Sequence, residues 1–76
     1  MFTATISDTG LSYSSENISD IGQKLNDYII ESYGTHTVVN VQKEETYDSC
    51  KKITSPGEYL ITPNRDSKNQ IYCKIG

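Results

Sequence analysis

The stretch that decides the fold is ENISDIGQKLNDYIIESYG, residues 16–34. Its apolar side chains recur three, seven, ten and eleven positions after the first, which places them along one side of an α-helix. They are Ile18, Ile21, Leu25, Tyr28 and Ile29. Ser and Asn residues before this stripe suit a helix N-cap, and Gly34 suits the end of the helix. The pattern predicts one long helix over residues 16–33 that buries the stripe against other elements.

The segments around this helix alternate in polarity or are rich in β-branched residues, which is typical of strands. They are residues 2–7, 11–14, 35–43, 58–62 and 69–75. Asp8-Thr9-Gly10 separates the first two and predicts a hairpin turn. Residues 44–55 fit either a helical turn or another strand. We expect a single small α+β domain over residues 1–76, with one helix packed on one face of an antiparallel sheet of four to five strands in the order β-β-α-β-(β)-β-β.

The side of the predicted helix opposite the apolar stripe is acidic. Four carboxylates fall within an arc of roughly 60° at 100° per residue. They are Glu16, Asp20, Asp27 and Glu31, and Lys24 borders the arc. Like charges four positions apart slightly destabilise a helix. The arc is therefore either ordinary solvated surface or a docking face, and we predict that these four residues bind a protein partner with a basic surface.

The charge of the chain is unevenly distributed. The net charge is −3, and the pI is about 4.9. Residues 1–48 hold eight acids and two lysines, a net of −6, whereas residues 49–76 hold two acids and five basic residues, a net of +3. An alternative function is therefore nucleic-acid binding through this second half, with Tyr59 and Tyr72 as stacking groups. Its basic residues are Lys51, Lys52, Arg65, Lys68 and Lys74. The overall acidity of the chain disfavours nucleic acid as a partner.

Residues that commonly serve in catalysis or metal binding are few and scattered. Asp8-Thr9-Gly10 resembles the tripeptide of aspartic proteases, which would imply two copies sharing a proton, but the same tripeptide is ordinary hairpin chemistry. His36 is the only histidine, and we expect it on the surface or on an edge strand. Cys50 and Cys73 lack metal-ligand spacing, and Cys73 alternates with isoleucines that face the core. We expect two free thiols, no metal site, no cofactor, no small-molecule substrate and no enzymatic activity.

The expected location follows from what the sequence lacks. Residues 1–6 show neither the basic nor the unbroken apolar region of a signal peptide, and the longest apolar run is three residues, 28–30. We expect no membrane span and a cytoplasmic protein.

The function that we expect is non-enzymatic protein binding. Ser, Ile, Lys, Tyr and Asn are plentiful, whereas Ala and Arg are scarce and Trp is absent, a bias that suits an AT-rich coding genome. In size and bias the chain resembles the small inhibitors that phages and other mobile elements make, including anti-CRISPR proteins. No motif carries this likeness. It implies an inhibitor that blocks a basic or nucleic-acid-binding site on a host protein.

Overall fold

A computed structural model describes residues 1–41, 45–63 and 68–76. These residues form one α-helix, α1 (Ile18–Tyr33), and one short 3-10 helix, η1 (Cys50–Lys52). The strands are β1 (Phe2–Ile6), β2 (Ser12–Ser15), β3 (Thr37–Asn40), β4 (Glu45–Tyr47), β5 (Gly57–Thr62) and β6 (Ile71–Ile75). The α+β class is confirmed. The sheet has six strands rather than four or five, because the ambiguous stretch 44–55 supplies both a strand and a helical turn.

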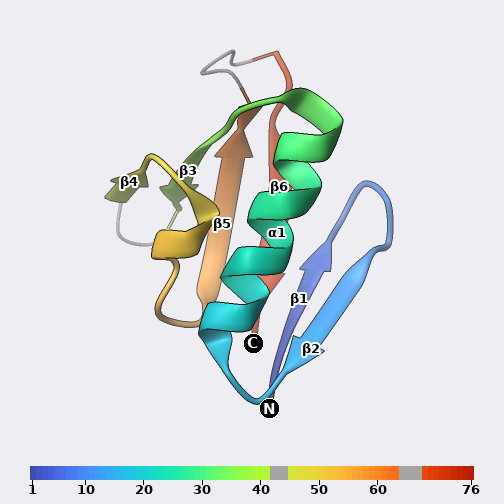
Figure 1. The fold of residues 1–76 in the computed structure, drawn as a ribbon, viewed down its shortest axis with the longest axis vertical. Coiled ribbons are helices and arrows are strands. Elements are labelled where there is room, and N and C mark those ends of the chain that lie inside the picture. The colour runs from blue at the N-terminus through green and yellow to red at the C-terminus, as the bar shows by residue number, and fades with distance from the viewer. Residues whose placement is uncertain (42–44, 64–67) are drawn as a thin grey trace.

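The six strands form one antiparallel sheet in the order β2-β1-β6-β5-β3-β4. Helix α1 lies across one face of this sheet, with β2 on one side of it and η1 on the other (Figure 1). The two chain ends meet at the sheet, where Thr3 and Gly76 exchange backbone hydrogen bonds of 2.8 and 3.0 Å. Strands β2 and β4 stand at the two ends of the strand order and are the edges of the sheet.

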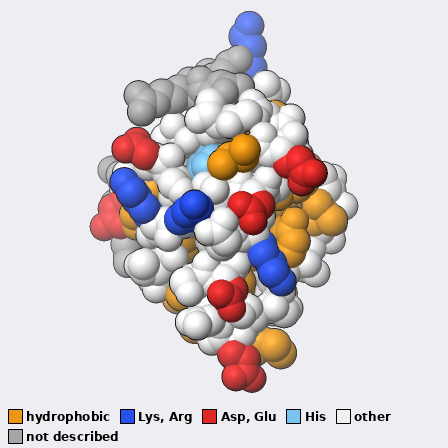
Figure 2. All heavy atoms as spheres, in the orientation of Figure 1, with side chains coloured by type: hydrophobic (Ala, Val, Ile, Leu, Met, Phe, Trp, Pro, Cys, Tyr) orange, Lys and Arg blue, Asp and Glu red, His pale blue; other side chains and the backbone are white. Residues whose placement is uncertain are grey.

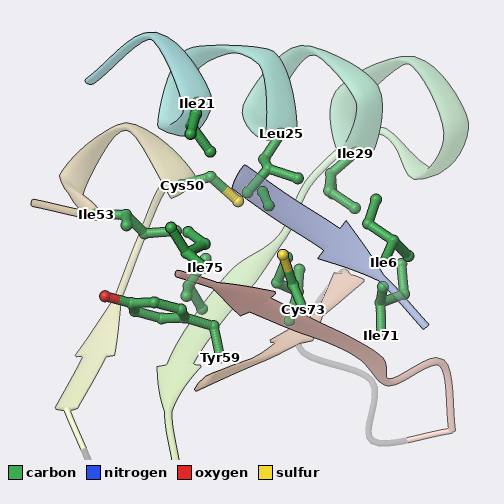
Figure 3. Packing of buried hydrophobic residues seen from close by; sticks show 13 residues of the cluster. Ile6, Ile21, Leu25, Ile29, Cys50, Ile53, Tyr59, Ile71, Cys73 and Ile75 are labelled. Carbon is green, nitrogen blue, oxygen red and sulfur yellow. The ribbon is translucent and has the colours of Figure 1, made fainter. Parts of the chain in front are cut away.

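The core fills the space between α1 and the sheet (Figure 3). Ile21, Leu25 and Ile29 are fully buried, as the helical periodicity predicts, whereas Ile18 and Tyr28 are half-buried at its margin. From the sheet, β6 contributes alternate residues. The buried hydrophobic residues are Ala4, Ile6, Ile21, Leu25, Ile29, Val38, Cys50, Ile53, Tyr59, Ile61, Ile71, Cys73 and Ile75. One helical stripe and the inward sides of four strands, together with Cys50 and Ile53, thus form a single core.

Helix α1 begins two residues later than its sequence pattern predicts. The side chain of Asn17, the N-cap residue, makes no capping hydrogen bond. Instead the Ser15 hydroxyl accepts the Asn17 N–H at 3.1 Å and donates to the Asp20 carboxylate at 3.0 Å. Glu16 therefore precedes the helix. Gly34 ends α1 as predicted, since its φ of 89° is strained for other residues and its N–H reaches the Ile30 carbonyl at 2.8 Å.

Candidate partner-binding surface

All four predicted carboxylates are exposed, but they are arranged less regularly than the sequence predicts. Asp20, Asp27 and Glu31 lie on α1 and span about 16 Å of its length at 1.5 Å per residue. Glu16 lies outside the helix, so its place in the helical arc is wrong. The structure therefore aligns three of the four residues on one side of α1, with Glu16 before its first turn.

The three helical carboxylates have different surroundings. Asp20 lies in the first turn, where it accepts a hydrogen bond from the Ser15 hydroxyl. Its negative charge is also stabilised there by the positive end of the helix dipole. Asp27 accepts a hydrogen bond of 2.8 Å from the Gln23 amide. Burial raises the pKa of the Tyr13 phenol on β2, and the nearby Tyr28 and Glu31 of α1 raise it further. Asp20 thus helps to hold the helix, whereas Asp27 and Glu31 sit on its surface.

Lysines also lie on this side of the molecule. Figure 2 shows acidic side chains interspersed with basic ones on the face that carries the helix. Lys24 is on α1, and Lys51 and Lys52 are on η1 beside it. Lys52 lies 3.9 Å from the carboxylate of Asp48. The three carboxylates therefore lie along the outer side of α1, opposite the sheet, with Lys24 between Asp20 and Asp27 in the sequence, and the acidic surface does not extend over η1.

On its other side, α1 is packed tightly against η1. A Cβ atom at Gly22 would lie 2.6 Å from the backbone oxygen of Cys50, so only glycine allows this approach. The Asn26 side chain, also buried, accepts a hydrogen bond of 2.9 Å from the Ser49 hydroxyl. The sequence placed Gly22 beside the apolar stripe, but nothing in its spacing identified η1 as the neighbour.

His36 is buried, with 6% of its surface exposed, so its predicted surface or edge-strand position is wrong. Its Nε2 accepts the backbone N–H of Cys50 at 2.7 Å. Burial lowers the pKa of the imidazole, which keeps this nitrogen a neutral acceptor. The His36 side chain thus holds η1 in place through the backbone N–H of Cys50. No local spacing could have revealed this, because the two residues are 14 positions apart, with His36 between α1 and β3 and Cys50 at the start of η1.

Both cysteines are free, as predicted, and both are buried. Burial raises the pKa of the Cys50 thiol to about 12 and that of Cys73 to about 11. At neutral pH both are protonated, and a protonated thiol is a poor nucleophile. Cys73 lies between Ile71 and Ile75 on the inward side of β6, as its alternation predicts. The two residues act here as small core side chains (Figure 3).

The basic half of the chain does not gather on one surface within the described residues. Tyr59 is fully buried, and its hydroxyl donates to the Ser55 carbonyl, so its predicted role as a stacking group is wrong. Lys74 points to the face of the sheet opposite α1, whereas Lys51 and Lys52 lie on the helix side. Arg65 falls outside the described residues. The described basic residues of this half of the chain therefore lie on two opposite faces of the molecule.

The turn at Asp8-Thr9-Gly10 is a hairpin connection, as predicted. Gly10 has a φ of 72°, and its N–H bonds to the Ile6 carbonyl at 3.0 Å, while the Leu11 N–H bonds to the Thr9 hydroxyl at 3.3 Å. The Asp8 side chain is exposed at this turn. Its sequence is thus explained by local backbone geometry.

One shallow hollow lies beside β3 and β4. Its lining residues are Thr37, Thr46, Asp48 and Thr62. Across the described ranges, no three His, Cys, Asp or Glu residues come together as metal ligands would. Nor is any helix there long and apolar enough to cross a membrane. Comparison of the chain with protein-family models, with curated proteins and with solved structures found no match.

Proposed function

We propose that this protein is a non-enzymatic protein-binding module that docks the acidic side of α1 on a basic surface of its partner. In the form that we favour, it is a cytoplasmic inhibitor of phage or mobile-element origin that covers a basic or nucleic-acid-binding site of a host protein. The observation that carries the proposal is the row of exposed carboxylates, Asp20, Asp27 and Glu31, along the outer side of the helix. In the parts of the chain that the structure describes, no lysine forms an ion pair with any of them.

The physical basis is electrostatic complementarity. Exposed carboxylates in a row create a local negative potential, although the net charge of the chain is only −3. Complementary charge steers two proteins together and mainly raises the association rate. At physiological salt the Debye length is about 8 Å, so only charges that come close to the partner contribute. Binding should therefore weaken as salt is added.

The test reverses the charges that have the least part in the fold. Asp27→Lys with Glu31→Lys changes the net charge by +4 and leaves Asp20, which supports the helix N-terminus, intact. The matched control is Glu45→Lys with Asp48→Lys, which makes the same change in net charge at exposed positions away from α1. Wild-type protein is used to isolate a partner from the source cells, and the purified partner is then titrated with each variant.

We expect the helix variant to bind at least tenfold more weakly, equivalent to about 1.4 kcal/mol, and the control variant to bind within about twofold of wild type. Equal loss in both variants would mean that net charge alone matters. Wild-type affinity in the helix variant at physiological salt would overturn the proposal.

A further inference from the structure

The outer side of β2 carries unpaired backbone groups. Strand β2 is at one end of the sheet order, and its inner side bonds to β1 through alternate residues. The Ile6 N–H donates to the Leu11 carbonyl at 2.9 Å. Since antiparallel strands pair through every second residue, Tyr13 and Ser15 also face β1. The N–H and C=O groups of Ser12 and Ser14 therefore point away from the sheet, and no described residue lies across from them.

The rest of the sheet agrees with this assignment. Thr3, opposite Ser14 on β1, exchanges both of its backbone hydrogen bonds with Gly76 on the far side. Because the N–H and C=O groups of Thr3 point toward Gly76, Thr3 forms no backbone hydrogen bond with Ser14 on its other side. Strand β2 also lacks the lysine, proline or bulge with which proteins commonly block an exposed edge. Its four residues are three serines and a tyrosine. This edge is thus a ready template for another strand.

We propose that the β2 edge binds an extended basic segment of the partner protein as a seventh strand of the sheet. This inference rests on the proposed function and names the mode of binding and the chemistry of the partner segment. Addition of a strand to an exposed sheet edge is a recurrent form of peptide recognition, in which main-chain hydrogen bonds supply affinity and alternate side chains supply specificity. Here Ser12 and Ser14 would supply four main-chain hydrogen bonds, two donated and two accepted.

The basic character of the segment follows from the side chains beside this edge. Directly opposed residues of neighbouring strands project to the same face of a sheet. Partner residues opposite Tyr13 and Ser15 would project to the helix side. There Glu31 lies near Tyr13, and Asp20 accepts a hydrogen bond from Ser15. Lys24 lies between these two carboxylates along α1, so the carboxylates outnumber the lysine on this part of the helix. Lysine or arginine at these two partner positions would meet a carboxylate each.

The partner residues between them would project to the opposite face. Nearest to the β2 edge, that face carries the hydroxyl groups of Ser14 and Thr3, which lie 3.1 Å apart. Small or β-branched side chains fit there. The predicted segment therefore alternates basic residues with residues such as threonine. A second copy of this chain is a poor occupant, because pairing β2 with itself would bring like carboxylates from the two α1 helices together.

The probe is a capped eight-residue peptide of alternating Thr and Lys, compared with one of alternating Thr and Glu. Each is titrated into the full chain while the amide signals and hydrogen exchange of Ser12 and Ser14 are followed by NMR. Ser14→Pro removes one outward N–H without removing a bond within the sheet. Ser14→Ala is its matched control, since it loses only the hydroxyl. Thr46→Pro places proline on the opposite edge strand, β4.

We expect the Lys peptide to slow exchange at Ser12 and Ser14 and to bind at least tenfold more tightly than the Glu peptide. Ser14→Pro should weaken binding at least tenfold, whereas Ser14→Ala and Thr46→Pro should stay within about twofold of wild type. Thermal unfolding establishes that each variant is folded.

Two results would overturn the inference: unchanged binding of the Lys peptide by folded Ser14→Pro, or equal binding of the Lys and Glu peptides. The first leaves the proposed function untouched, because that is tested separately by Asp27→Lys with Glu31→Lys on the whole partner. If those charge reversals have no effect and Ser14→Pro still abolishes peptide binding, the proposed function fails and the edge alone is the site.

Discussion

The two flanks of α1 differ in almost every respect although they belong to one helix. On the η1 flank, Gly22 touches the Cys50 backbone, Asn26 bonds to Ser49, and His36 holds the Cys50 N–H. On the β2 flank, Tyr13 and Tyr28 are only half-buried beside exposed carboxylates. The first flank is closed by buried hydrogen bonds, and the second leaves side chains and an unpaired strand edge at the surface.

This difference shows how a small domain can divide its tasks. A chain of 76 residues has a thin margin of stability, because it buries a smaller share of its surface than a larger domain does. Concentrating buried polar contacts on one flank leaves the other free to vary without unfolding the protein. Substitutions on the two flanks should therefore have opposite profiles, with large effects on stability on one and large effects on binding on the other.

The largest effect on stability should come from a core residue that lies between the two flanks of α1. Leu25 is fully buried beneath the helix. Leu25→Ala should lower the free energy of unfolding by about 2–5 kcal/mol, because it removes buried apolar surface and leaves a cavity. Urea unfolding followed by circular dichroism measures this change. A loss below about 1 kcal/mol would contradict the single core described above.

Gly22→Ala should break the closed flank. The added Cβ would lie 2.6 Å from a backbone oxygen, which cannot rotate away, so α1 and η1 must separate. Overpacking of this kind costs about 1–3 kcal/mol, partly offset by about 1 kcal/mol of higher helix propensity. Unfolding midpoints are compared with those of Ser19→Ala, an exposed position on the same helix. Equal midpoints in the two variants would mean that the contact is not restrictive.

Acid should loosen the same flank through His36. Burial lowers the pKa of the folded imidazole below its usual value of 6.5, so the unfolded chain binds more protons than the folded one between these two values. This contribution to stability is complete above pH 6.5 and is lost as the pH falls. Unfolding of wild type and His36→Gln is measured from pH 7.5 to 5, since glutamine can accept the Cys50 N–H without titrating. Parallel pH profiles would refute the role of His36.

The smallest effect on stability is expected on the open flank. Asp27→Lys with Glu31→Lys should change the free energy of unfolding by no more than about 0.5 kcal/mol, because both side chains are exposed. A lysine at position 31 is also favoured near the helix C-terminus. Chemical unfolding of the double variant checks this expectation. A loss as large as that of Gly22→Ala would erase the contrast between the flanks.

Periodic patterns in the sequence were sufficient to predict the elements that bury one side against the core. The stripe of Ile21, Leu25 and Ile29 predicted α1, and the alternation of Ile71, Cys73 and Ile75 predicted β6 and its inward face. Gly34 marked the helix end. These features depend on residues within one or two turns or on every second residue, so the sequence displays them directly.

Only the tertiary structure decided which sides of these elements are closed. His36, which precedes β3, meets the backbone of Cys50 in η1, and Gly22 meets the same residue from α1. The hairpin was predictable, but that β2 would be an outer strand beside Glu31 depends on the order of all six strands. Such contacts join residues far apart in the chain, and they are selected by the packing of the whole core, which no local pattern encodes.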